Sequence, residues 1–76
     1  MNKLSNEIKN LQHRKQNIID LMLKDGYNEY NIAVLCAMCL VPIYVAYYFI
    51  YEETKNEDAL NNCKRLCEEY RLEFDL

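Results

Sequence analysis

The sequence has 76 residues, a formal net charge of −3 at pH 7 and 51% hydrophobic residues. A chain of this length forms at most one domain and, in water, buries only about 60% of its unfolded surface. The negative charge and the lack of a basic patch with interleaved aromatic residues argue against nucleic-acid binding. With one glycine and one proline, turn signals are few, so an all-α fold is predicted.

Residues 1–29 are predicted to form an N-terminal amphipathic helix, with its helical part between about Lys3 and Lys24. Its apolar residues recur at spacings that place them on one helix face: Leu4, Ile8, Leu11, Ile18 and Met22. Gly26, the only glycine in the sequence, follows the last turn and is typical of a helix stop.

Residues 30–51, with the sequence YNIAVLCAMCLVPIYVAYYFIY, contain no charged side chain. The stretch from Ile32 onward would be about 30 Å long as a helix, which matches the hydrocarbon core of a bilayer. Its leucine, isoleucine, valine and phenylalanine residues contribute on the order of −3 to −5 kcal/mol to membrane insertion. Tyrosine rings favour the headgroup level, and the predicted interfacial aromatics are Tyr27, Tyr30, Tyr47, Tyr48 and Tyr51. The sequence therefore predicts one transmembrane helix over residues 30–51.

A soluble alternative stays open for this segment. Pro42 could break it into two short helices, over residues 30–41 and 43–54, that form a buried hairpin. Neither half has a polar stripe, however, and only two thin amphipathic helices would remain to cover both. The exclusion of charge therefore favours the membrane span over the hairpin.

Residues 52–76 are acidic, with eight Asp or Glu and four Lys or Arg, and predict a C-terminal amphipathic helix outside the membrane. We expect a lone chain to be unable to bury the apolar stripes of both terminal helices, so the stripes are interpreted as partner-facing. On the N-terminal helix the stripe is the one given above. On the C-terminal helix the partner-facing residues are Cys63, Leu66, Cys67, Tyr70 and Phe74.

The four cysteines occur as Cys36-x2-Cys39 and Cys63-x3-Cys67. Four thiols would suit a tetrahedral zinc ion or an iron–sulfur cluster, but the first pair would lie within the membrane and the second about one helix beyond it. Neither a helix N-terminus nor a cation lies near the first pair to lower a thiol pKa. We expect small apolar packing residues, with no metal and no cofactor, and leave open a disulfide to a partner or between Cys63 and Cys67.

No catalytic grouping is found. His13 is the only histidine, no Ser/His/Asp arrangement surrounds it, and a single glycine excludes a phosphate-binding glycine loop. We therefore expect neither enzymatic activity nor a small-molecule substrate.

Small residues predict helix association within the central segment. Ala33 and Ala37, with Cys36 beside them, form a strip that would allow a neighbouring helix to approach closely. Pro42 cannot donate to the carbonyl of Met38, so a kink is expected there. The predicted helix-packing residues are Ala33, Cys36, Ala37 and Pro42.

This layout, a helix on each side of one span, resembles the single-span supernumerary subunits of mitochondrial respiratory complexes, particularly cytochrome c oxidase. The resemblance is architectural and carries no residue role. It implies a non-catalytic accessory subunit of a respiratory-chain or ATP synthase complex in the mitochondrial inner membrane, packed on other subunits and on the lipid bilayer. The alternatives are a small membrane regulator or phage-type protein in a bacterial or viral host membrane, and a soluble helical interaction module.

Overall fold

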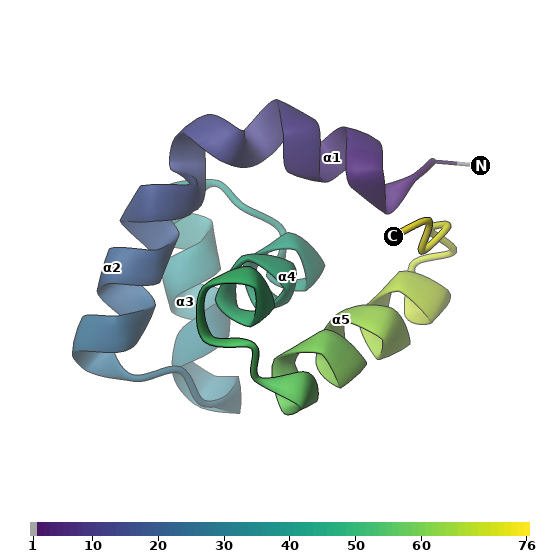
Figure 1. The fold of residues 1–76 in the computed structure, drawn as a ribbon. Helices are drawn as coiled ribbons and strands as arrows, with labels where there is room; N and C mark the ends of the chain where they lie inside the picture. Colours follow the sequence, from purple (N-terminus) through teal and green to yellow (C-terminus); the bar gives the residue numbers. More distant parts are fainter. Residues whose placement is uncertain (1) are drawn as a thin grey trace.

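A computed structural model describes residues 2–76, and this part of the chain contains five α-helices and one 3₁₀ helix (Figure 1). The elements in chain order are α1 (Leu4–Leu11), η1 (Gln12–Arg14), α2 (Lys15–Asp25), α3 (Glu29–Cys39), α4 (Ile43–Thr54) and α5 (Glu57–Glu69). The described residues form no strand beyond an isolated bridge between Lys3 and Glu73. The predicted all-α class is confirmed.

The N-terminal helix predicted between Lys3 and Lys24 is divided at η1, where the backbone tightens to 3₁₀ geometry. The division falls between Leu11 and Ile18, where the apolar stripe has its longest gap. Figure 1 shows the chain changing direction here, so that α1 runs across the top of the molecule and α2 runs down its side. The two parts of the stripe thereby contact different sides of the core.

The central segment is also divided, which corrects the prediction of one continuous helix over residues 30–51. The axes of α3 and α4 are bent by 98° at a short break. Pro42 lies at the N-cap of α4 with φ −62° and ψ 149°, and a proline disfavours helical geometry in the residue before it. The break predicted in the soluble alternative is therefore present, and the membrane span stays a prediction. Among the described helices, none is by itself both long and apolar enough to cross a membrane, whereas Tyr30–Cys39 and Ile43–Thr54 together meet that test.

Three helices end with a non-glycine residue in the left-handed region: Leu40 after α3, Lys55 after α4 and Arg71 after α5. At the end of α3, the Leu40 N–H donates to Ala37 O (3.4 Å) and the Val41 N–H to Cys36 O (3.0 Å). The same pair of bonds recurs after α5, from Arg71 to Glu68 (3.2 Å) and from Leu72 to Cys67 (2.7 Å). Both are Schellman caps, which satisfy the carbonyl groups left free in the last turn.

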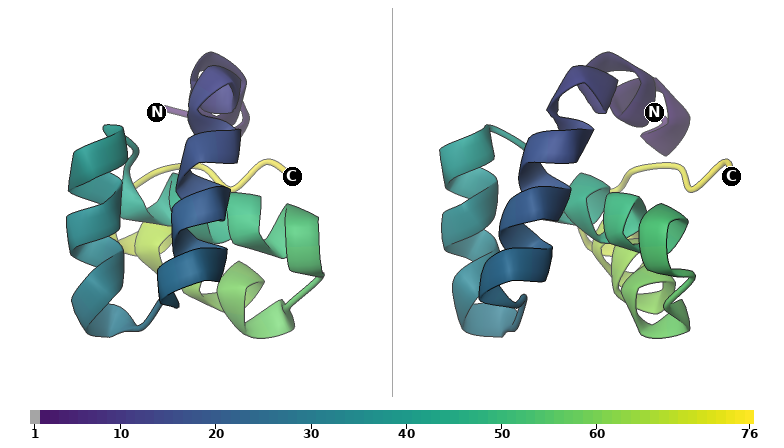
Figure 2. Two further views of the ribbon diagram at one scale, coloured as in Figure 1. Left: turned by 90° about the vertical axis from the view of Figure 1, so that its left-hand side faces the viewer. Right: turned by 60° about the vertical axis from the view of Figure 1, so that its left-hand side comes forward.

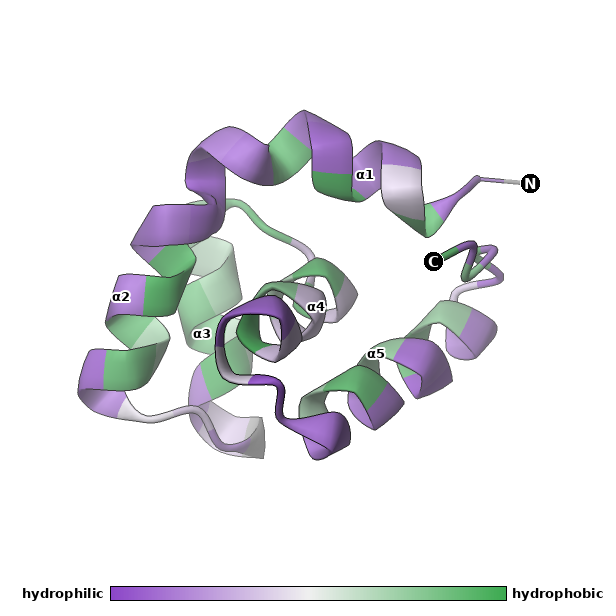
Figure 3. Cartoon of the chain, in the orientation of Figure 1, coloured by the Kyte–Doolittle hydropathy of each residue, from purple (hydrophilic) through white to green (hydrophobic). Residues whose placement is uncertain are grey.

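The core is built around α4, which contacts each of the other α-helices. Val45, Ala46, Phe49 and Ile50 of α4 are fully buried. Figure 2 shows α4 between α2 and α5, and Figure 3 shows green, hydrophobic stretches along α5 on the side that faces α4.

This arrangement corrects most of the partner-facing assignments. Seven of those residues are buried within the chain itself: Leu4, Ile8, Ile18, Met22, Cys63, Leu66 and Cys67. Leu11 and Phe74 are partly buried against the same core, and only Tyr70 is exposed. The physical reason is that α4 is apolar on all sides and offers both stripes an internal surface on which to pack.

The two ends of the described chain are tied together. The Leu4 N–H donates to Glu73 O (2.9 Å), and the Glu73 N–H donates to Asn2 O (2.8 Å). The Ser5 N–H donates to Asp75 Oδ1 (3.0 Å), and the Ser5 hydroxyl donates to Asp75 Oδ2. These bonds lower the pKa of Asp75 below its ordinary value and place a carboxylate at the N-terminus of α1, where the helix dipole favours an anion.

The stop after α2 generates the first prediction. Gly26 has φ 79° and ψ 159°, a region almost closed to other residues, while a Cβ added there would meet no atom within 4 Å. Because the cost is then backbone strain alone, Gly26→Ala should lower the free energy of unfolding by about 1–3 kcal/mol. Urea denaturation measures this, with the exposed Lys24→Ala as control and a change below about 0.5 kcal/mol expected for it. Equal stability of the two variants would contradict the assigned backbone geometry.

The cap of α5 generates the second prediction. Arg71 has φ 56° and an exposed side chain, so its left-handed conformation costs free energy that glycine would not pay. Arg71→Gly should raise the free energy of unfolding by about 0.5–1 kcal/mol. Arg71→Val should lower it, because a β-branched residue is least tolerated there. Urea denaturation of both variants tests this. If the change in the free energy of unfolding had the same sign for both, the left-handed cap at Arg71 would be contradicted.

Candidate functional site: the outer face of α3

One face of α3 is apolar and uncovered. Tyr30, Val34 and Met38 follow one another at intervals of four residues and expose 84%, 55% and 67% of their surface. Leu40 extends the face beyond the helix end and is 68% exposed. We define the outer face of α3 as Tyr30, Ala33, Val34, Ala37, Met38 and Leu40, all of which are exposed and none of which is charged.

The opposite face of α3 contributes to the core through Ile32, Leu35 and Cys36. From Ile32 to Cys39 the helix is thus apolar on both faces, a composition that normally belongs to a fully buried helix. Large exposed apolar patches on small proteins commonly mark interaction sites. The outer face of α3 is therefore the strongest candidate site in the described chain.

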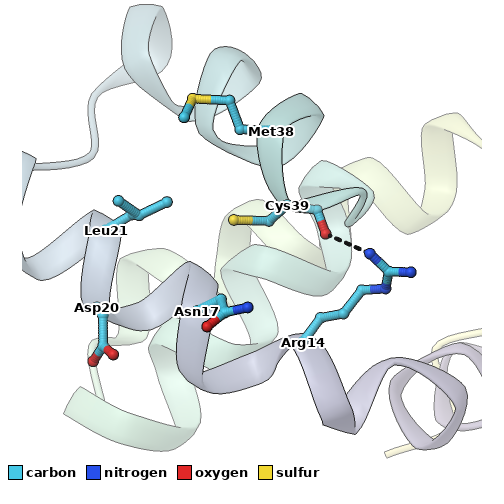
Figure 4. Close-up of a pocket in the computed structure, with 6 residues that line it drawn as sticks. All are labelled: Arg14, Asn17, Asp20, Leu21, Met38 and Cys39. Carbon is cyan, nitrogen blue, oxygen red and sulfur yellow. Dashed lines mark hydrogen bonds between the residues drawn. The ribbon is translucent and has the colours of Figure 1, made fainter.

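A groove between α2 and α3 lies beside this face. Near the end of α3 it widens into a hollow of about 440 Å³, whose lining includes Arg14, Asp20, Leu21 and Met38. Figure 4 shows this end, where Nη1 of Arg14 donates to the carbonyl oxygen of Cys39 at 3.2 Å.

The other end of the groove is a second hollow, of about 340 Å³, lined by Asp25, Tyr30, Asn31, Val34 and Leu35. The apolar ridge of α3 is thus flanked by a groove with Arg14 and Asp20 at one end and Asp25 at the other. Such a shape suits a docked helix, because apolar residues can cover the ridge while polar residues meet the rim.

The structure separates the predicted helix-packing residues. Ala33 and Ala37 lie on the outer face of α3, whereas Cys36 points into the core and is 3% exposed. Pro42 is half-buried at the start of α4. Only the two alanines are therefore available for contact with another chain.

The predicted interfacial tyrosines occupy different environments. Tyr30 is exposed, Tyr47 is buried in the core, and Tyr27, Tyr48 and Tyr51 are half-buried. The Tyr27 hydroxyl accepts a hydrogen bond from Nδ2 of Asn56 at 3.3 Å, which joins the segment before α3 to the start of α5. Tyr30 alone contributes to the outer face of α3.

All four cysteines are free thiols. Burial raises the pKa of Cys36 to about 12, and it also raises the pKa of Cys63 and of Cys67. Buried, protonated thiols are poor nucleophiles, which supports their interpretation as packing residues. Among the side chains that the structure describes, no group of three or more from His, Cys, Asp or Glu is arranged to hold a metal ion.

The sequence did not single out Val34, Met38 and Leu40, nor Arg14 and Asp25 at the two ends of the groove. A usable signal was present in the uniform apolarity of residues 30–40, because a short helix in a small bundle cannot be covered on every side. From the sequence alone, the same apolarity predicts contact with lipid.

Comparisons with protein-family models, with curated proteins and with solved structures find no match. The resemblance to supernumerary respiratory-complex subunits therefore stays a prediction.

Thiol reactivity is the third prediction. With a pKa of about 12, Cys36 would be a thiolate in about one molecule in ten thousand at pH 8. Iodoacetamide at pH 8 should therefore modify one residue quickly, the partly accessible Cys39, and modify Cys36, Cys63 and Cys67 only after unfolding. Peptide mass spectrometry identifies which cysteines are modified at each time. In the Cys39→Ser variant, the rapidly formed modification should be absent. Rapid modification of all four thiols in the folded protein would be inconsistent with the core described.

Proposed function

We propose that this chain is a non-catalytic helical interaction module that docks on a protein partner through the outer face of α3. The observation that carries the proposal is the exposure of Tyr30, Val34 and Met38 on one uncharged helix face. Bringing these side chains out of water contributes roughly 25 cal/mol per Å² of apolar surface, and this favourable term offsets part of the entropic cost of association.

Three features support a protein-binding role. The other helices direct their stripes towards α4, so the outer face of α3 is the continuous apolar surface left uncovered in the described chain. The groove beside it adds polar groups at its rim, which can set the register of a bound helix. The buried thiols have raised pKa values, and a raised value does not favour nucleophilic chemistry.

Site-specific photocrosslinking tests this proposal and gives the fourth prediction. A benzophenone amino acid at position 34, on the outer face of α3, should give a discrete crosslinked product in the source cells. The matched control places the same group at position 9, where Lys9 is exposed on α1. Identical patterns at the two positions, or no product at either, would refute docking through α3.

A second candidate function is an accessory subunit of a membrane complex, as the resemblance implies. It is favoured by one observation: Tyr30–Cys39 and Ile43–Thr54 together have the length and apolarity of a span. In that case α3 and α4 would contact lipid and neighbouring subunits, with the mitochondrial inner membrane as the expected location.

Alkaline carbonate extraction of membranes distinguishes the two candidates. Retention of the protein in the pellet would favour the membrane subunit, and release into the supernatant would contradict it. Position 34 would then crosslink to lipid in the first case and to protein alone in the second.

A further inference from the structure

We propose that the partner on the outer face of α3 is a second copy of this chain, with the two α3 helices antiparallel across a two-fold axis. The inference rests on the proposed function, because it names the occupant of the same surface. Its support comes from the charges at the two ends of the α2–α3 groove and from the order of side chains along α3.

The first argument is that two opposite charges at the ends of the groove form no ion pair with any side chain that the structure describes. Arg14 precedes α2 and Asp25 ends it, and neither forms an ion pair with another described side chain. The Arg14 guanidinium uses Nη1 for the Cys39 carbonyl and keeps further N–H donors. The Asp25 carboxylate lies at the C-terminus of α2, where the helix dipole disfavours an anion and a nearby cation would stabilise it.

The second argument is symmetry. Helices α2 and α3 lie side by side and run in opposite directions, joined by a short connection (Figures 1 and 2). Consider a two-fold axis that lies in the contact plane and is perpendicular to α3. This axis places the α2 helices of the two copies along the same edge of the α3–α3 contact, where they face each other and run antiparallel. Arg14 of each copy then lies opposite Asp25 of the other. The two ion pairs form together, because a two-fold interface uses the same patch twice.

The third argument is the order of residues on the outer face of α3. With Val34 near the axis, Tyr30 of one copy lies opposite Met38 of the other, and methionine sulfur packs favourably on aromatic rings. Ala33 and Ala37 have small side chains and lie between these larger ones. The axes of the two α3 helices can therefore approach to about 8–10 Å. The face is therefore complementary to itself in the antiparallel orientation.

The area available fits a modest dimer. From the exposed fractions of its residues, the outer face of α3 presents on the order of 500 Å² of apolar surface. This is less than the roughly 800 Å² that each partner buries in a standard interface, and the adjoining rim of α2 adds to it. We therefore expect a dissociation constant on the order of micromolar, set by a small contact.

One residue should oppose association. Asp20 lies midway along α2 on the same rim, so it approaches its own copy near the axis. Its carboxylate already accepts a hydrogen bond from Nε2 of Gln16 at 2.7 Å, which an amide oxygen can also accept. Asp20→Asn should tighten the dimer by about two- to five-fold by removing like-charge repulsion.

Sedimentation equilibrium of the purified full chain, over a concentration series at low salt, tests the proposal and is the fifth prediction. The wild-type protein should pass from monomer to dimer, and Val34→Glu should weaken the dimer at least ten-fold. The control Leu23→Glu changes a leucine of similar exposure on α2, outside the proposed contact, and should leave association unchanged. Circular dichroism of each variant checks that the helices persist.

A charge exchange makes the test specific to the antiparallel arrangement. Arg14→Glu and Asp25→Arg should each weaken the dimer by about five-fold, and the double variant should restore most of the wild-type affinity. Because Arg14→Glu also removes the bond to Cys39, Asp25→Arg provides the cleaner single variant. Failure of the double variant to recover affinity would overturn the arrangement, as would a dimer insensitive to Val34→Glu.

A wild-type protein that stays monomeric at all concentrations overturns self-association outright. If position 34 nevertheless crosslinks to a different protein, the proposed docking function stands and only the identity of the partner is wrong. If position 34 gives no crosslink as well, both proposals fail together.

Discussion

The fold depends on the need to cover α4, a helix whose sides are all apolar. Each neighbouring helix supplies one strip of cover, and the amphipathic stripes of the terminal segments are used for this purpose. A polar pair lies where α4 leaves the core: Nζ of Lys15 lies 3.1 Å from Oε1 of Glu52 and 5.9 Å from the centre of the Phe49 ring. The partly buried pair of Lys15 and Glu52 covers one end of the core while its charged groups stay in contact with water. The buried residues form one continuous hydrophobic core.

The same requirement explains why α3 remains incompletely covered. Helix α3 is as uniformly apolar as α4, but it lies at the edge of the bundle, with α2 beside it (Figure 2). A chain of 76 residues has too much surface for its volume to surround two such helices. The outer face of α3 is the apolar surface that stays uncovered. The charges on the adjoining rim of α2 differ between its two ends, so they favour one orientation of a bound partner.

Local features of this fold could be read from the sequence, and its long-range arrangement could not. The stop at Gly26, the break at Pro42 and the stripe of α5 all follow from residue type and spacing. A membrane span and a broken pair of core helices can have the same composition. Because hydropathy depends on composition alone, it does not reveal a bend between two helices. Leucine is not a typical residue for a left-handed cap, so the sequence marks a break near Pro42 but does not mark the cap at Leu40. Residue spacing shows that the stripes are apolar, but it does not show that they pack on α4, because that contact depends on the direction of α4 after the bend.

The pairing of the chain ends has a consequence for the order of folding. Ser5 and Asp75 are 70 residues apart, so their contact closes almost the whole chain into a ring. Closing a loop of that length has a large entropic cost, and contacts of high sequence separation form late. The helical hairpins formed by α2 with α3 and by α4 with α5 are local and can assemble first. We therefore expect α1 to dock last, against a preformed core, and to detach first when the protein opens.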